Sequence, residues 1–139
     1  MFVATMMVIV TVLIHGSGLF GLSRALRVEA SEKHRFQIDL VSVRGLGFTL
    51  LLVLSLFALH GIEIWAYGVF YLTVGALPNI LDAVYFSTIT YGTIGYDDEG
   101  LAHGWKMVAA IEGINGIILL GWSTAFFVTV VQRIGTTSR

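Results

Sequence analysis

The chain has 139 residues, of which 56% are hydrophobic and only 12% are charged. Soluble domains carry about a quarter charged residues, so this composition excludes an ordinary soluble protein and indicates one that lies in a membrane. The chain contains no cysteine, which excludes disulfides and thiolate metal sites, and its formal net charge of −1 favours no class of partner.

Residues 1–22 form the first predicted membrane span, because they are apolar and roughly 20 residues suffice to cross a bilayer. No Lys or Arg precedes this span, whereas Arg24 and Arg27 follow it directly. The positive-inside rule therefore places the N-terminus outside and residues 23–44 in the cytoplasm as a charged connector, with nothing in it that resembles a nucleic-acid-binding module. His15 is polar within the span, and we expect it to bond to a neighbouring helix rather than to relay protons.

A second span is predicted to begin near Gly45, and its outer end carries the aromatic side chains typical of a membrane interface, namely Trp65, Tyr67 and Tyr71. His60 and Glu63 are three residues apart in this span and therefore share one face of the helix. Two ligands are too few for a metal site within a chain. We instead expect both side chains to make polar contacts with the neighbouring pore segment, with Glu63 as buried polar support.

A short helix is predicted after a turn over residues 73–76. Pro78 suits the first position of this helix, because its missing N–H costs nothing there. Asn79 is a possible cap, and Asp82 in the first turn suits the positive end of the helix dipole. Residues 79–91 are too few to cross a membrane, so they predict a re-entrant pore helix whose C-terminal end favours a cation near the membrane centre.

The third span begins at Trp105, an interfacial anchor, and Arg133 closes it on the cytoplasmic side. Residues 134–139 would form a short cytoplasmic tail. Gly116 and Gly121 interrupt this helix, which permits either close helix packing or a hinge, and we expect packing.

Glu112 also lies within the third span. A carboxylate at this depth should either bond to a partner behind the pore loop or face a water-filled cavity, and we expect the structural role. The predicted fold is thus an all-α membrane protein with three transmembrane helices and a pore helix between the second and third. Residues 45–133 would form its pore domain.

The stretch Thr93-Ile94-Gly95-Tyr96 lies between the predicted pore helix and the third span. Irregular backbone is tolerated at membrane depth only where it lines a wet, protein-walled path, and its carbonyls can then coordinate a cation. This stretch is similar to the filter signature of potassium channels, T-V-G-Y-G. With Asp98 after it and Trp105 seven residues further on, the region from about Gly45 to Arg133 resembles small bacterial two-transmembrane, pore-loop potassium channels with an additional N-terminal span.

The resemblance implies a homotetramer in the inner cell membrane that conducts monovalent cations passively and is not an enzyme. The carbonyls of Thr93, Ile94, Gly95 and Tyr96 and the Thr93 hydroxyl would hold potassium ions in four stacked sites. No organic cofactor is implied. Each chain would contribute one wall of the pore, in contact with the lipid bilayer on its outer side.

Two positions depart from the family pattern. Gly92 stands where a threonine usually precedes the filter, and Asp97 replaces the second filter glycine. Asp97 and Asp98 would add carboxylates at the outer mouth and raise the local cation concentration. These departures leave open a weakly selective cation channel, and a non-conducting accessory subunit is a further alternative.

An intramembrane metalloenzyme is an alternative of a different class. It would be built from four polar side chains of the spans, His15, His60, Glu63 and Glu112. We discount it, because the sequence shows no three-ligand pattern of a catalytic metal site and the filter stretch would have no use.

Overall fold

The computed structural model describes residues 1–32, 42–95 and 100–136, and these residues contain helices and turns but no strand. The elements are α1 (Phe2–Glu32), α2 (Val43–Thr73), α3 (Ile80–Tyr91), the short 3-10 helix η1 (His103–Trp105) and α4 (Lys106–Thr136). Three helices of the described part, α1, α2 and α4, are long and apolar enough to cross a membrane. The predicted all-α architecture with three spans is therefore confirmed for these residues.

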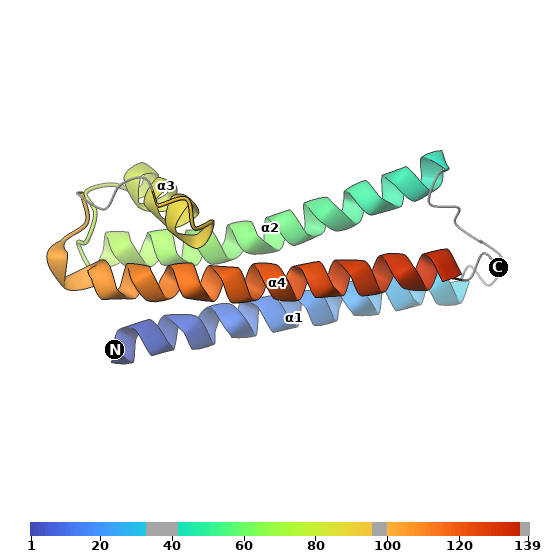
Figure 1. Ribbon diagram of the computed structural model, residues 1–139, viewed down its shortest axis with the longest axis horizontal. Coiled ribbons are helices and arrows are strands. Elements are labelled where there is room, and N and C mark those ends of the chain that lie inside the picture. Colours follow the sequence, from blue (N-terminus) through green and yellow to red (C-terminus); the bar gives the residue numbers. More distant parts are fainter. Residues whose placement is uncertain (33–41, 96–99, 137–139) are drawn as a thin grey trace.

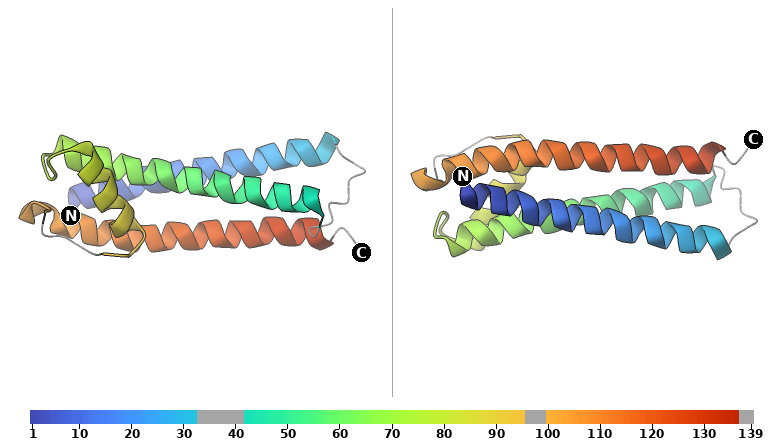
Figure 2. Two further views of the ribbon diagram at one scale, coloured as in Figure 1. Left: turned by 90° about the horizontal axis from the view of Figure 1, so that it is seen from above. Right: turned by 90° about the horizontal axis from the view of Figure 1, so that it is seen from below.

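The three long helices lie side by side, with α1 and α4 running in one direction and α2 in the other (Figure 1). The short helix α3 lies at the end of the bundle where α1 begins. Views from above and below place α1 and α3 on opposite sides of the α2–α4 pair (Figure 2). Side chains that connect α1 to α3 must therefore lie between α2 and α4.

Helix α1 continues past the predicted end of the first span at residue 22 and reaches Glu32. Its residues Phe2–Leu26 are long and apolar enough to cross a membrane. Residues 23–32 contain neither glycine nor proline, so the helix continues after the apolar stretch has ended. The predicted connector over 23–44 thus begins as helix, residues 33–41 lie outside the described part, and Ser42 caps α2 by accepting from the Gly45 N–H at 3.1 Å.

Helix α3 is capped by Asn79, as predicted, but Pro78 is not its first residue. Asn79 has an extended backbone, and its side-chain oxygen accepts from the Asp82 N–H at 2.9 Å. The Asn79 amide also donates to the Asp82 carboxylate at 2.7 Å. Because the cap residue itself precedes the first helical residue, Ile80, the proline lies one position outside the cap.

Replacing Asn79 with alanine should destabilise the protein by about 1 kcal/mol, because two of its side-chain bonds at the start of α3 are lost. Unfolding by SDS titration of the purified protein measures this difference. Asn79→Ser is the matched control, since a hydroxyl still accepts from the Asp82 N–H and most of the stability should be retained. Equal loss in both variants would contradict a capping role.

Two apolar clusters hold the helices together. The first surrounds α3 and joins the buried rings of Tyr67 and Tyr71 on α2 to Phe86 on α3. The second joins α1 to α2 through Leu19 and Leu59. Large apolar side chains also cover the outside of the bundle, which suits helices that face lipid.

Candidate functional site

The segment after α3 is held against the end of that helix by its own backbone. The N–H groups of residues 92–95 all donate to carbonyls in the last turn of α3, at 2.8–3.1 Å. In the part of the chain that the structure describes, no backbone N–H donates to the carbonyls of Thr93, Ile94 or Gly95. The segment therefore satisfies its donors within the chain and leaves this row of acceptors available for a ligand.

The backbone of this segment is unusual. Thr93 has a φ of 59° and Gly95 a φ of 64°, both in the left-handed region. Glycine adopts this region freely, whereas for threonine it costs roughly 1–2 kcal/mol. Such strain persists only where the surroundings impose it, and it is common at binding sites. All four residues from 92 to 95 are exposed in the single chain, so the protein does not cover this segment.

The other residues predicted for the filter and outer mouth, Tyr96, Asp97 and Asp98, lie outside the described residues.

Glu112 is fully buried between the helices, behind α3. Its carboxylate accepts from the Tyr71 hydroxyl at 2.6 Å and from the Ser87 hydroxyl at 2.5 Å. The Ser87 oxygen also lies 3.0 Å from the Ile64 carbonyl, so the single hydroxyl proton is shared between the two acceptors. Glu112 thus ties α4 to α2 and α3 at one point, and it occupies no open cavity.

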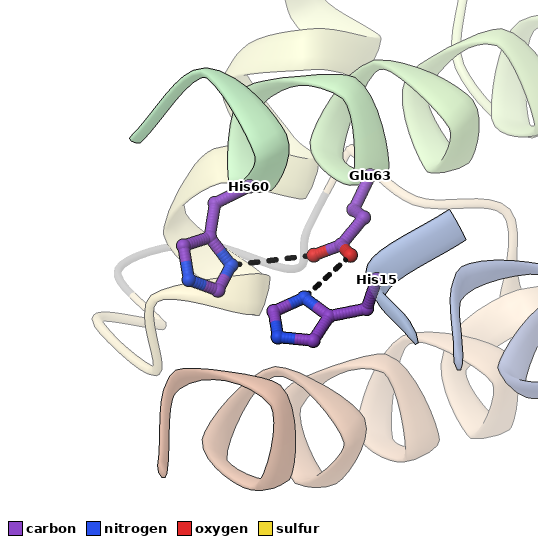
Figure 3. Close-up of side chains that lie close together, drawn as sticks. All are labelled: His15, His60 and Glu63. Carbon is purple, nitrogen blue, oxygen red and sulfur yellow. Dashed lines mark hydrogen bonds and ion pairs between the residues drawn. The ribbon is translucent and has the colours of Figure 1, made fainter. Parts of the chain in front are cut away.

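Glu63 is the centre of a second buried group. Its Oε1 lies 2.8 Å from His15 Nδ1, its Oε2 lies 3.2 Å from His60 Nδ1, and the Tyr91 hydroxyl donates to the same Oε2. Figure 3 shows the two imidazole rings near one another, each joined to a different oxygen of the carboxylate. The Tyr91 hydroxyl also lies 2.9 Å from His60 Nδ1. Because Tyr91 is the last residue of α3, this group connects α1, through α2, to the start of the segment 92–95.

Helix α1 is bonded to α4 as well. The Asn115 amide donates to the Thr11 hydroxyl at 2.8 Å, and His15 Nε2 lies 3.3 Å from the Ser123 hydroxyl. His15, Thr11 and Asn115 are all buried. The first span is therefore joined by polar contacts to both of the other long helices.

The two glycines predicted on the third span have different surroundings. A Cβ placed on Gly116 would collide with the Tyr91 carbonyl group, whereas a Cβ on Gly121 would meet nothing within 4 Å. Of the two, only Gly116 lies where α4 passes closely behind the end of α3. Its small size permits that approach.

The structure brings together three potential metal ligands that we did not expect to converge. The donor atoms of His15, His60 and Glu63 all lie within 4.8 Å of one another. The sequence pattern showed only the pair His60 and Glu63, to which the structure adds His15, and Glu112 is not part of the set. Tyr91 was not predicted to have a role, and its position at the end of α3 was the available signal.

A family model described as "Ion channel" matches residues 50–133. The chain therefore belongs to this family of two-transmembrane, pore-loop ion channels, as its resemblance predicted. The matched region covers most of α2, all of α3 and most of α4, and it leaves out α1.

The searches of curated proteins and of solved structures found no match. The family and the three apolar helices define a multi-pass membrane protein, and they point to a channel rather than to an enzyme.

Proposed function

We propose that the chain is one subunit of a homotetrameric potassium-selective channel that conducts passively through a filter formed by residues 93–96. The observation that carries this proposal is the backbone pattern after α3. The N–H groups of residues 92–95 are bonded back to the helix, whereas the carbonyls of Thr93, Ile94 and Gly95 belong to exposed residues and accept from no backbone N–H of the described residues. Carbonyl oxygens in a protein-walled path replace the hydration shell of a potassium ion.

Helix α3 serves as the pore helix in this proposal. It has 12 residues, which at about 1.5 Å per residue cannot cross the hydrocarbon core. Its C-terminal end lies directly before Thr93, so the negative end of the helix dipole faces the filter and favours a cation there.

Four copies are needed because one chain forms only one wall. In the single chain Ile94 is 52% exposed and its carbonyl row has no facing partner among the described residues. Irregular backbone with free polar groups is not tolerated against lipid. Four chains around a fourfold axis would turn the four rows towards one another and away from the membrane, while the lipid-facing sides of α2 and α4 remain outside.

The charge distribution supports an external filter. Arg24, Arg44 and Arg133 lie near the end of the bundle opposite to α3, at the end of α1, the start of α2 and the end of α4 (Figure 1). The positive-inside rule then places this end and the C-terminus in the cytoplasm, and the N-terminus and the filter outside. Asp97 and Asp98 would lie at the outer mouth and attract cations.

Flux through the purified protein in liposomes tests this proposal. We expect potassium flux to exceed sodium flux by at least about tenfold, a difference of about 1.4 kcal/mol, and to be blocked by barium. Gly95→Ala should lose the flux, since alanine is strained at a φ of 64°. Gly104→Ala is the matched control, because a Cβ there meets nothing within 4 Å.

The outcomes separate the alternatives. Equal potassium and sodium flux would replace the selective channel with a weakly selective one, in which Gly92 and Asp97 loosen the filter. A stable tetramer without flux would overturn conduction and favour an accessory subunit. A monomer in cross-linking and light scattering would overturn the tetramer.

A further inference from the structure

His15, His60 and Glu63 form a compact group of metal-ligating atoms that the conduction proposal does not use. We propose that they bind a divalent transition-metal ion of the zinc type, with the Tyr91 hydroxyl beside it. The ion would join α1 to the pore domain at the last residue of α3. The proposal does not rest on conduction, because the group lies behind the filter segment.

The distances suit such an ion. In a tetrahedral zinc site with bonds of about 2.0–2.1 Å, neighbouring ligand atoms are roughly 3.3 Å apart. His15 Nδ1 and Glu63 Oε1 are 2.8 Å apart, and His60 Nδ1 and Glu63 Oε2 are 3.2 Å apart. One donor atom from each of the three residues lies within 4.8 Å of the others, so modest movements of the two rings and the carboxylate would bring all three around one ion.

The chemistry of the donors selects the class of metal. Two imidazole nitrogens and one carboxylate oxygen suit zinc and its neighbours, whereas potassium, magnesium and calcium favour sites made of oxygen. The chain has no cysteine, so no thiolate can select copper(I). The Tyr91 hydroxyl, 2.9 Å from His60 Nδ1, adds a nearby oxygen.

The surroundings of His15 also fit a metal ligand. A histidine that binds metal through one ring nitrogen commonly donates its other N–H to a nearby acceptor, which fixes the tautomer. His15 Nε2 lies 3.3 Å from the Ser123 hydroxyl, which can accept. With the metal on Nδ1, the ring proton would lie on Nε2 and point to Ser123.

The buried negative charge of Glu63 favours a cation at this site. Glu63 is fully buried, and its ion-pair partners among the described residues are His15 and His60. A buried carboxylate beside two neutral imidazoles would leave one uncompensated negative charge, which is costly. A divalent ion compensates this charge while both imidazoles remain neutral. A proton on one imidazole is the competing explanation, and the experiment must separate the two.

The site depends on a helix outside the family match. His15 belongs to α1, whereas the match begins at residue 50 and contains His60, Glu63 and Tyr91. A bound metal would hold α1 against the pore domain and fix Tyr91, the residue directly before Gly92. It would thus stabilise the part of α3 from which the filter segment begins.

The test uses the full-length protein with any affinity tag removed. After treatment with EDTA and dialysis against zinc, elemental analysis should find one zinc ion per chain. His15→Gln and His60→Gln should each lose this ion. His103→Gln should keep it, because His103 is an exposed histidine on η1 and serves as the matched control. Zinc should also raise the thermal midpoint of the unmodified protein but not of the two ligand variants.

A spectroscopic measurement keeps the test decisive if a variant fails to fold. Cobalt(II) bound to the unmodified protein should give the visible absorption bands of a tetrahedral site, and zinc should abolish them. Absence of these bands and of bound zinc in the folded protein would overturn the proposal. Zinc retained by folded His15→Gln and His60→Gln would overturn it as well. An unchanged thermal midpoint with zinc and with EDTA would instead favour the protonated network.

Discussion

Gly116→Ala should abolish potassium flux and lower the stability of the protein by about 1–3 kcal/mol, the cost of inserting a methyl group into a packed contact. The added Cβ would lie 3.0 Å from the carbonyl carbon and 3.2 Å from the Cα of Tyr91, and closer still to the carbonyl oxygen. These are backbone atoms and cannot rotate away. Either α4 must move outwards or the end of α3 must shift, and the filter segment moves with it.

Gly121→Ala is the matched control on the same helix. A Cβ there meets nothing within 4 Å in the single chain, and alanine favours a helix over glycine by roughly 1 kcal/mol. Flux assays in liposomes and SDS unfolding of both variants measure the difference. If Gly116→Ala conducts as well as Gly121→Ala, the close approach of α4 to Tyr91 has no role in the filter.

Glu112→Ala should destabilise the protein by about 2–4 kcal/mol. The variant loses the bonds from Tyr71 and Ser87, and bonds of this kind between membrane helices contribute about 0.6 kcal/mol on average and at most about 1.7. The cavity left by the shortened side chain adds to this cost. The loss falls where α2, α3 and α4 meet, so we expect reduced assembly as well as reduced stability.

A variant of one hydrogen-bond partner of Glu112 separates the cost of losing a bond from the cost of the cavity. Tyr71→Phe removes one donor to Glu112 and keeps the ring, and it should cost less than Glu112→Ala. In the Glu112→Ala background, Tyr71→Phe should cost less than it does alone, because the acceptor of its hydroxyl is already absent. SDS unfolding of the four proteins measures this coupling. Strict additivity would show that the Tyr71–Glu112 bond contributes nothing to folding.

The membrane spans and the cap of α3 could be predicted because each depends on a short stretch of sequence. Apolar length alone defines the spans, and Asn79 caps the helix through a residue only three positions away. The end of α1 was less predictable. Hydropathy marks where the apolar stretch ends, but helix propensity carries α1 to Glu32.

The sequence did not predict which polar side chains contact one another inside the bundle. His15 and Glu63 are 48 residues apart, and their contact depends on how α1 packs against α2. That packing relies on apolar surfaces such as Leu19 against Leu59, for which the sequence offers many registers. Residues 93–95 are the opposite case, since their residue types alone suggested the proposed filter, whereas the bonds from their N–H groups to the end of α3 required the structure.

The position of the Ser87 hydroxyl between two long helices couples their movements to α3. One oxygen atom of α3 lies 2.5 Å from the Glu112 carboxylate on α4 and 3.0 Å from the Ile64 carbonyl on α2. Hydrogen bonds are lost beyond about 3.5 Å, so the contact with Glu112 can lengthen by about 1.0 Å and the contact with Ile64 by about 0.5 Å before the link breaks. We therefore expect a tilt of α4 against α2 to pull on α3, so that movement of the two long helices is coupled to the short one.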